Sequence, residues 1–174
     1  EALYLTSGYV YPNAEAAEEA FAQRLDRFVY SRYGSPTVGM LEERLRLIEG
    51  AEACRVTATG MAAVNAALLC QLKAGDRVVA ARCLFSSSLW ILQDLLARFG
   101  VETVFVDGTD MAQWQRALAQ PAACVLLETP SNPTLEVIDL PAVATLAHKA
   151  GARVIVDNVF ATPLLQKPLA LGAD

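Results

Sequence analysis

The stretch Arg153-Val154-Ile155-Val156-Asp157-Asn158-Val159-Phe160-Ala161-Thr162-Pro163 decides the fold class. Residues 154–157 form a short apolar run that ends in an acid, which is typical of a central parallel strand. In open α/β sheets the ligand crevice lies outside the carboxyl ends of the strands. Asp157 stands at such an end, and a carboxylate there costs free energy unless a cationic group meets it. The nature of that cationic group is the first question about this chain.

The composition indicates a well-buried globular protein. The chain has 174 residues, enough for one domain with a sizeable core, and 54% of them are hydrophobic. Its net charge is −5 and its Lys and Arg residues are scattered, so we expect no nucleic-acid partner. No apolar run reaches the roughly 18 residues of a membrane helix, and residues 1–13 lack the pattern of a signal peptide. These features predict a cytoplasmic protein without a membrane partner.

Cysteine and histidine usage argues against disulfide and metal chemistry. Cys54, Cys70, Cys83 and Cys124 form no CxxC pair and lie in apolar segments. We interpret them as reduced core cysteines of a cytosolic protein. His148 is the only histidine and follows a helical pattern, so we expect a surface helix residue and no metal site.

Helical and strand patterns alternate along most of the chain. The expected helices are 14–28, 37–50, 60–72, 86–99, 110–119 and 139–150, and the expected strands are 54–57, 77–81, 101–106, 123–127 and 153–157. Such alternation predicts βαβ units and a mostly parallel sheet with flanking helices. We therefore expect a helical N-terminal arm over residues 1–50 and an α/β domain over residues 51–174.

A candidate phosphate site lies at residues 57–63, Thr-Ala-Thr-Gly-Met-Ala-Ala, where an expected strand leads into a helix. Gly60 allows a ligand to approach the backbone, and the free N–H groups at a helix start suit a phosphate. An ordinary strand-to-helix turn would look the same. The segment matches neither GxGxxG nor GxxxxGK[ST], so dinucleotide and P-loop sites lack their fingerprints.

Three further loops carry residues suited to binding. Phe85 could stack on a flat ligand or belong to the core. Asn132, in a loop stiffened by two prolines, offers both a donor and an acceptor, or it belongs to a rigid turn. Arg32 can bind an anion, with Tyr30 adding a hydroxyl, or it is a solvated surface residue.

The loop residues together suit one kind of ligand. A phosphate-type turn, an aromatic ring, an Asn and an Asp after four expected strands fit a flat, anionic, nitrogen-containing ring. The carboxylate of Asp157 can keep a pyridine nitrogen protonated, since an adjacent negative charge favours the cation. A protonated ring is an electron sink, which is the design of pyridoxal-phosphate (PLP) sites.

Four motifs make the chain similar to a known family. They are YSRYGSPT (residues 30–37), TGMAA (59–63), ETPSNPT (128–134) and DNVFATP (157–163). In this order they resemble the Cys/Met-metabolism family of PLP-dependent enzymes. The resemblance implies an enzyme with the aspartate-aminotransferase-like fold of PLP-dependent transferases.

The resemblance implies roles for matching positions. Gly60 and Met61 would give backbone N–H groups to the cofactor phosphate, and Asn132 would lie near the ring hydroxyl. Phe85 would stack on the pyridine ring, and Asp157 would pair with its nitrogen. Asp157 and Phe85 are thus the candidate catalytic residues of the chain.

The resemblance also implies sharing of sites between subunits. Tyr30 and Arg32 would reach the cofactor phosphate of a neighbouring subunit, so residues 1–50 would serve the partner's site. We therefore expect a homo-oligomer, usually a tetramer in this family. Ser35 replaces the Asn that is common in this motif, with little consequence because both are turn residues.

Two features bear on the reaction. The arm Leu5–Tyr11 and Phe85, where other members more often have Tyr, resemble enzymes that replace succinate on O-succinylhomoserine with sulfide. The expected function is therefore this γ-replacement, giving homocysteine in methionine biosynthesis. Cystathionine γ-synthase or γ-lyase activity is the alternative within the family. A non-catalytic α/β module that binds a phosphate ligand is the alternative outside it.

The family holds PLP as a Schiff base on a lysine in a Ser/Thr-rich motif after the strand of Asp157. Lys73, Lys149 and Lys167 lack that context, and we interpret all three as solvent-exposed. The expectation is that the chain is part of a longer polypeptide whose later residues supply the lysine. The 174 residues alone would then not be a competent enzyme.

Overall fold

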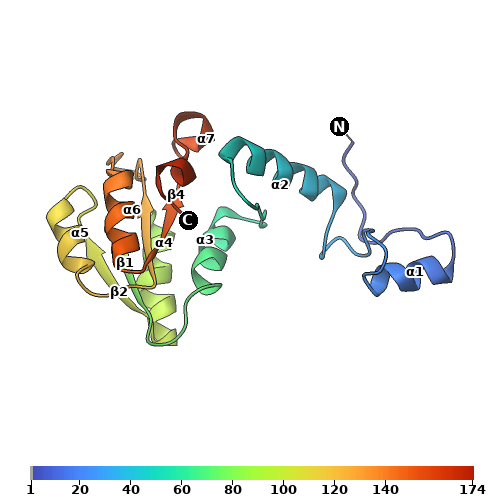
Figure 1. Cartoon of the computed structure of the whole chain (residues 1–174), viewed down its shortest axis with the longest axis horizontal. Coiled ribbons are helices and arrows are strands. Elements are labelled where there is room, and N and C mark those ends of the chain that lie inside the picture. Colours follow the sequence, from blue (N-terminus) through green and yellow to red (C-terminus); the bar gives the residue numbers. More distant parts are fainter. Residues whose placement is uncertain (1) are drawn as a thin grey trace. The chain divides into compact units, whose positions relative to one another are not determined.

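The computed structural model describes residues 2–174 and divides the chain into two compact units (Figure 1). We name them the N-terminal unit (Glu1–Val56) and the sheet unit (Thr57–Asp174). The sheet unit contains a four-stranded parallel sheet with the strand order β2-β1-β3-β4. Its strands are β1 (Arg77–Ala81), β2 (Glu102–Val106), β3 (Cys124–Glu128) and β4 (Arg153–Asp157). The expected α/β class with a mostly parallel sheet is confirmed.

The strand order reverses between β1 and β3. From β1 the chain passes to β2 on one side, then returns to form β3 on the other side of β1, followed by β4. The loops that leave β1 and β3 therefore diverge. In open parallel sheets this point, beyond the carboxyl ends of the strands, is where ligands bind.

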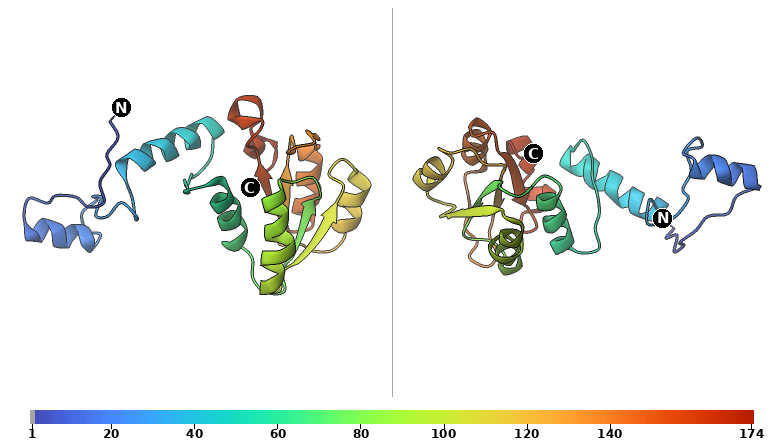
Figure 2. Two further views of the ribbon diagram at one scale, coloured as in Figure 1. Left: turned by 180° about the vertical axis from the view of Figure 1, so that it is seen from behind. Right: turned by 90° about the horizontal axis from the view of Figure 1, so that it is seen from below.

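Helices cover both faces of the sheet (Figure 2). Helices α3 (Gly60–Leu69) and α4 (Ser86–Trp90) pack on one face, and α5 (Met111–Ala117) and α6 (Leu140–Lys149) pack on the other. The segment 86–99 is helical throughout, as expected, but it changes to a π-helix at Ile91–Leu95 and to a 3-10 helix at Leu96–Phe99.

The side chains of β1 alternate between two hydrophobic clusters. Val78 and Ala80 join the cluster of α3 and α4, whereas Val79 and Ala81 join that of α5 and α6, and all four are fully buried. This alternation is the period-two geometry of a strand. Trp114 is also fully buried, and its indole N–H donates to the Gly108 carbonyl at 3.0 Å. The sheet is thus fixed from both faces.

Aspartate side chains cap two helices of the sheet unit. The Asp110 carboxylate accepts the Ala112 N–H at 2.8 Å at the start of α5, and the Asp139 carboxylate accepts the Ala142 N–H at 3.1 Å at the start of α6. The second helix begins at residue 36, one residue earlier than expected. This helix, α2 (Pro36–Glu49), follows Ser35, because a proline suits the first helical position.

Other predicted boundaries are wrong. The first helix, α1 (Ala14–Phe21), stops well before residue 28, because the chain enters the left-handed region at Gln23 with φ 58°. Residues 54–57 form no strand, since none of the described strands pairs with them; the Val56 N–H instead donates to the Glu42 carboxylate at 3.0 Å. The structure adds a short helix after β4, α7 (Thr162–Leu165), and a 3-10 turn at Pro168–Leu171.

The expectation of four core cysteines is correct only in part. All four are free thiols, but Cys124 alone is buried, and Cys70 at the end of α3 is exposed. Helix α3 reads GMAAVNAALL and is apolar on nearly every side. Its sequence therefore could not indicate which face is buried. His148 is exposed on α6, as expected.

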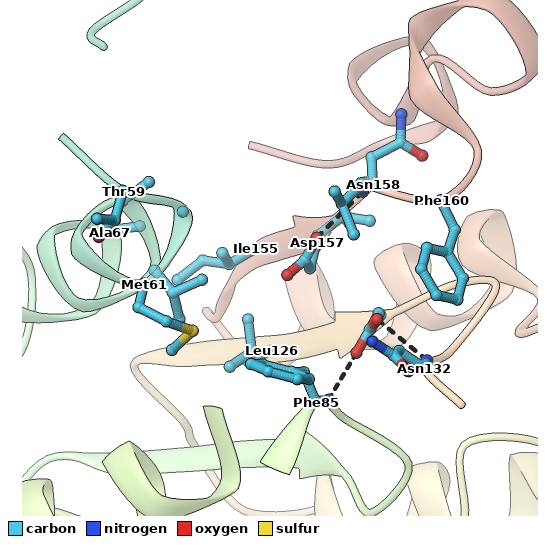
Figure 3. A pocket seen from close by; sticks show the side chains of 16 residues that line it. Thr59, Met61, Ala67, Phe85, Leu126, Asn132, Ile155, Asp157, Asn158 and Phe160 are labelled. Atoms are coloured by element: carbon cyan, nitrogen blue, oxygen red, sulfur yellow. Dashed lines mark hydrogen bonds between the residues drawn. The ribbon is translucent and has the colours of Figure 1, made fainter. Parts of the chain in front are cut away.

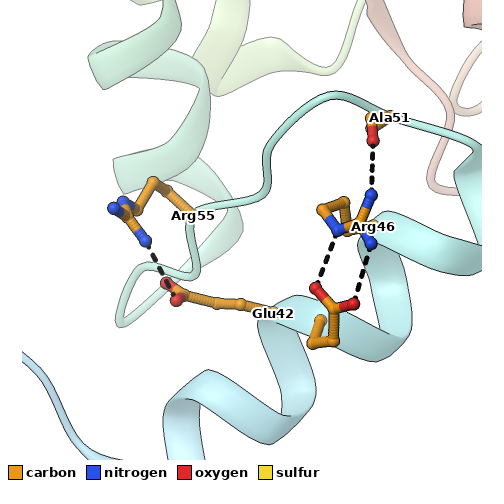
Figure 4. Close-up of polar contacts among 5 residues, drawn as sticks. Glu42, Arg46, Ala51 and Arg55 are labelled. Carbon is orange, nitrogen blue, oxygen red and sulfur yellow. Dashed lines mark hydrogen bonds and ion pairs between the residues drawn. The ribbon is translucent and has the colours of Figure 1, made fainter.

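The N-terminal unit is organised by polar contacts at the end of α2 (Figure 4). Arg46 pairs with Glu43 at 2.7 Å and donates to the Ala51 carbonyl at 3.2 Å, while Arg55 pairs with Glu42 at 3.2 Å. Among residues 2–56, only Ala20 is a buried hydrophobic residue. This unit therefore has no core comparable to that of the sheet unit.

Candidate active site

A pocket of about 590 Å³ lies at the carboxyl ends of the strands in the sheet unit (Figure 3). This volume is within the range of small-molecule sites. The start of α3 and the segments after β1, β3 and β4 line it. Its lining includes five of the candidate residues predicted from sequence, Gly60, Met61, Phe85, Asn132 and Asp157.

Asp157 ends β4 and directs its carboxylate into this pocket (Figure 3). Its Oδ1 atom accepts the Val159 N–H at 3.1 Å. Within residues 2–174, no donor is recorded for the second oxygen, Oδ2. Asp157 therefore offers a free acceptor to a cationic group in the pocket.

The start of α3 forms one side of the pocket. The Thr59 hydroxyl caps the helix by accepting the Ala62 N–H at 3.1 Å. The first N–H groups of a helix lack intrahelical acceptors, which leaves those of Gly60 and Met61 for a ligand. A Cβ atom at Gly60 would meet nothing within 4 Å, so the space beside this backbone is open. An anionic group fits here.

Phe85 and Asn132 lie in the loops after β1 and β3. Phe85 is 39% exposed and lines the pocket, so it is not a core residue. Both loops are held by Glu128, the last residue of β3. Its Oε2 accepts the Phe85 N–H at 2.7 Å, and its Oε1 accepts the Asn132 N–H at 3.1 Å.

Glu128 is a site residue that the sequence analysis did not single out. It is 1% exposed, and burial raises the pKa of its carboxyl, with the negative charge of Asp157 adding to the effect. Glu128 and Asp157 are register partners at the ends of β3 and β4. The signal was available in the sequence, because both expected strands end next to an acid.

A second network joins the loops after β3 and β4. The Gln166 side-chain amide donates to the Thr129 carbonyl and to Asn158 Oδ1, both at 3.0 Å, and the Asn158 amide donates back to the Gln166 carbonyl at 2.9 Å. Asn158 and Phe160 line the pocket (Figure 3). The sequence analysis did not single out Asn158 or Phe160, because it selected only Asp157 from their motif.

Tyr30 and Arg32 belong to the N-terminal unit and do not line this pocket. The Arg32 guanidinium lies over the rings of Tyr30 and Tyr33, at 5.2 and 5.6 Å from their centroids. No ion pair or hydrogen bond of its side chain is recorded within residues 2–174. Arg32 is thus a cation available to an anion, and its role in a neighbouring site stays a prediction.

Other candidates are excluded from the pocket. Lys73, Lys149 and Lys167 are exposed, as expected, and none of them lines the pocket.

Across residues 2–174, no cluster of three or more His, Cys, Asp or Glu side chains could hold a metal ion. In that same range, no helix is long and apolar enough to cross a membrane.

Comparison with known proteins decides the family. The family model described as "Cys/Met metabolism PLP-dependent enzyme" matches residues 1–174. The chain belongs to this family. The resemblance carried by the four sequence motifs is therefore confirmed, including the dependence of the family on PLP.

Individual relatives agree with this assignment. The chain is 60% identical over 174 residues to an O-succinylhomoserine sulfhydrylase of Mycobacterium tuberculosis, covering 100% of this chain and 43% of that protein. The crystal structure of a "cystathione gamma lyase" from Micromonospora echinospora matches with a TM-score of 0.87 at 38% identity, over 100% of this chain and 43% of that one. The chain thus spans less than half the length of the relatives it matches.

A third relative bears on the cofactor. The structure of an O-acetylhomoserine (thiol)-lyase from Campylobacter jejuni, which contains N'-pyridoxyl-lysine-5'-monophosphate, matches with a TM-score of 0.89 at 28% identity. The match covers 100% of this chain and 43% of that one. The pocket described above suits such a group, because it combines an open helix start, a free carboxylate oxygen and an exposed ring.

Proposed function

We propose that the protein carrying this chain catalyses a PLP-dependent γ-replacement on O-succinylhomoserine, in which sulfide displaces succinate and homocysteine forms. The observation that carries the proposal is the convergence of Asp157, Phe85 and Asn132 with the start of α3 in one pocket. The substrate class is supported by the 60% identity to an O-succinylhomoserine sulfhydrylase. The reaction would belong to methionine biosynthesis in the cytoplasm.

The residues of this chain would divide the work of holding PLP. When bound, PLP supplies a ring that withdraws electrons from the amino-acid substrate. Asp157 keeps a proton on the pyridine nitrogen through its free carboxylate oxygen, which preserves the positive charge of the ring. Gly60 and Met61 donate backbone N–H groups to the phosphate.

Phe85 and Asn132 would orient the ring. The Phe85 side chain is free to stack on one ring face. It lacks the hydroxyl of a tyrosine, so it stabilises the ring without exchanging a proton with the substrate. The Asn132 amide would face the ring hydroxyl as a hydrogen-bond partner.

Arg32 and Tyr30 would bind the phosphate in a neighbouring subunit's site. The free guanidinium of Arg32, held over two aromatic rings, supports this assignment. The proposal then requires a homo-oligomer, which we take to be a tetramer with sites shared between pairs of subunits. The lysine that binds PLP would come from outside these 174 residues, because the three lysines in them do not line the pocket.

The first test concerns the cofactor. The purified protein should be yellow and should lose its visible absorption band on treatment with borohydride, which reduces the covalent link between PLP and a lysine. A colourless protein that binds a nucleotide would refute the proposal and favour a non-catalytic phosphate-binding module.

The second test concerns the reaction. O-succinylhomoserine is supplied with sulfide or with cysteine, and homocysteine and cystathionine are quantified. We expect homocysteine from sulfide as the main product. Faster formation of cystathionine from cysteine would instead assign a cystathionine γ-synthase, and cleavage of cystathionine would assign the γ-lyase activity, the candidate favoured by the Micromonospora structure.

A further inference from the structure

Glu128 connects the two loops that diverge at the reversal of strand order. It is the last residue of β3, it is 1% exposed, and each of its two carboxylate oxygens accepts one backbone N–H. One donor is Phe85, in the loop after β1; the other is Asn132, in the loop after β3. Figure 3 shows both hydrogen bonds as dashed lines.

The sheet explains why one side chain reaches both loops. Strands β1 and β3 are adjacent and parallel, so their carboxyl ends lie side by side. Phe85 stands four residues after Ala81, the end of β1, and Asn132 stands four residues after Glu128, the end of β3. The Glu128 carboxylate therefore lies within hydrogen-bonding distance of one backbone N–H from each loop.

A buried carboxylate in this position acts as a restraint. An ionised group out of water is tolerated only when hydrogen bonds satisfy it. Both hydrogen bonds to the ionised carboxylate are charge-assisted, which makes them stronger than bonds between neutral groups. If either loop moved away, an oxygen of Glu128 and a backbone N–H would both lose their partner. The carboxylate thus penalises displacement of Phe85 and of Asn132.

We propose that Glu128 is a positioning residue of the cofactor site, which fixes the backbone of Phe85 and Asn132 so that the aromatic ring and the amide face the bound ring together. This inference rests on the proposed function, because it takes PLP as the ligand of the pocket. Glu128 itself would act through the two loops and would not contact the reacting atoms. The positioning role of Glu128 follows from its two hydrogen bonds and not from a sequence motif.

The test uses the Glu128→Gln variant of the full-length protein. Glutamine has the same shape, but its NH₂ group cannot accept an N–H, so one of the two loops must lose its bond. The matched control is Glu102→Gln, which removes the same charge from an exposed position on β2 with no side-chain hydrogen bond recorded in residues 2–174.

Three measurements are compared between the variants. Amide hydrogen exchange at Phe85 or Asn132 should accelerate at least about tenfold in Glu128→Gln, since a charge-assisted bond is lost. The dissociation constant of PLP should rise roughly tenfold or more for the same reason. The induced circular dichroism of bound PLP should change shape. Glu102→Gln should match the wild type in all three.

A double-mutant cycle separates positioning from general support of the fold. In a Phe85→Ala/Asn132→Ala background the loops no longer carry the side chains that Glu128 would position. There, Glu128→Gln should raise the PLP dissociation constant less than about twofold. An equal rise in both backgrounds would overturn the proposal and leave Glu128 a structural residue.

A further variant covers the case in which Glu128→Gln does not fold. Glu128→Asp keeps the charge but withdraws the oxygens by one methylene, so it should also alter the dichroism of bound PLP. If either variant folds and its exchange, PLP affinity and dichroism equal those of the wild type, the inference is wrong while the proposed function stands. A wild-type protein that binds no PLP would refute the proposed function instead.

Discussion

The two units of the chain are stabilised in different ways. The sheet unit contains two hydrophobic clusters, one on each face of the sheet, with fully buried residues such as Val79 and Leu126. Among residues 2–56, the N-terminal unit buries one hydrophobic residue, Ala20. Its contacts are mostly polar or between rings: for example, the Tyr9 and Tyr11 hydroxyls donate to the backbone carbonyls of Gly34 and Phe28.

The difference matters for the site. Residues placed by the sheet, such as Asp157, have positions fixed by a core packed on both faces, which is how sites are preorganised. Arg32 is held only by two neighbouring rings. This chain would therefore contribute to PLP binding in two ways. The sheet unit would place rigid groups such as Asp157 around the pyridine ring, and the N-terminal unit would supply Arg32 as a less firmly held cation.

The largest expected effect tests the core itself. Leu127 on β3 is fully buried, so Leu127→Ala should lower the free energy of unfolding by about 2–5 kcal/mol. Leu47 on α2 is 62% exposed, and Leu47→Ala should change it by less than about 0.5 kcal/mol. Urea unfolding of both variants provides the measurement. Similar losses in the two would mean that Leu47 is covered in the assembled protein, and the contrast between the units would fail.

The next effect tests Asp157, a site residue placed by the sheet. Asp157→Ala should reduce kcat/KM roughly hundredfold or more, because the ring nitrogen loses the negative charge that keeps it protonated. The fold, followed by far-ultraviolet circular dichroism, should be unchanged, since only the Val159 N–H bond is lost.

Asp107 offers a control for this variant. It follows β2, where its Oδ1 accepts the Thr109 N–H at 2.9 Å, and it does not line the pocket. Asp107→Ala should keep kcat/KM within about threefold of the wild type, as for most surface substitutions. Near-normal turnover by Asp157→Ala would contradict the role of this residue.

The sequence predicted the sheet unit better than the N-terminal unit, and the core explains why. The expected strands 77–81 and 153–157 have the observed bounds, and β1 is buried along most of its length. β4, however, is the last strand of the described sheet and buries only Val154, so the central position expected for it is wrong. Residues 54–57 have a similar pattern and form no strand, since strand formation depends on a hydrogen-bonded neighbour that a local pattern cannot reveal. The expected first helix, 14–28, is too long for a related reason. No local sequence feature indicates that Gln23 adopts a left-handed conformation, which prevents the helix from continuing.

The sequence predicted residues that line the pocket, but it did not predict the residues that hold the pocket loops in place. Motifs identified Asp157 and Asn132, and its place after an expected strand identified Phe85; all three line the pocket. The sequence analysis selected neither Glu128, in spite of its place at the end of an expected strand, nor Gln166, because the function of both depends on partners in other loops. Ligand-facing residues follow from chemistry at strand ends, whereas positioning residues follow from three-dimensional neighbours.

A smaller effect is expected from the N-terminal unit. Arg32→Ala should raise the PLP dissociation constant about tenfold, since one charge-assisted contact to the phosphate is lost. Arg24→Ala serves as the control, because Arg24 pairs with Glu19 on the surface at 2.8 Å and should not affect PLP. Affinity is measured by fluorescence titration of the apoprotein.

Mixing subunits tests whether Arg32 serves a neighbouring site. Arg32→Ala and Asp157→Ala proteins are dissociated, combined and reassembled. If the two residues serve the same site from different subunits, some mixed sites contain neither substitution and activity should return in part. Failure to recover activity, with mixed assemblies demonstrated by mass spectrometry, would contradict the shared site.

The smallest expected effect is a difference in pH dependence between the units. Burial raises the pKa of Glu128 above its ordinary value, so the folded state binds this proton more tightly than the unfolded state. The contribution of Glu128 to stability therefore falls as pH rises from the ordinary carboxyl pKa of 4.5 through the raised one. In the N-terminal unit, the hydrogen bond from Arg46 lowers the pKa of Glu43, so its contribution is present above pH 4.5 and is lost as pH falls through the lowered pKa.

The two opposite pH dependences can be measured as differences in unfolding free energy between the wild type and each variant. Urea unfolding between pH 3 and pH 7 is compared for the wild type, Glu128→Gln and Glu43→Gln. The stability of the wild type relative to Glu128→Gln should decrease with rising pH, whereas that relative to Glu43→Gln should increase slightly, because Glu43 is exposed and its ion pair is screened by water. Slopes of the same sign would mean that Glu128 is held in its charged form by the two backbone N–H groups more strongly than burial opposes it. That outcome would make the carboxylate an even firmer link between the loops of Phe85 and Asn132, since the charged form is the one that accepts both bonds.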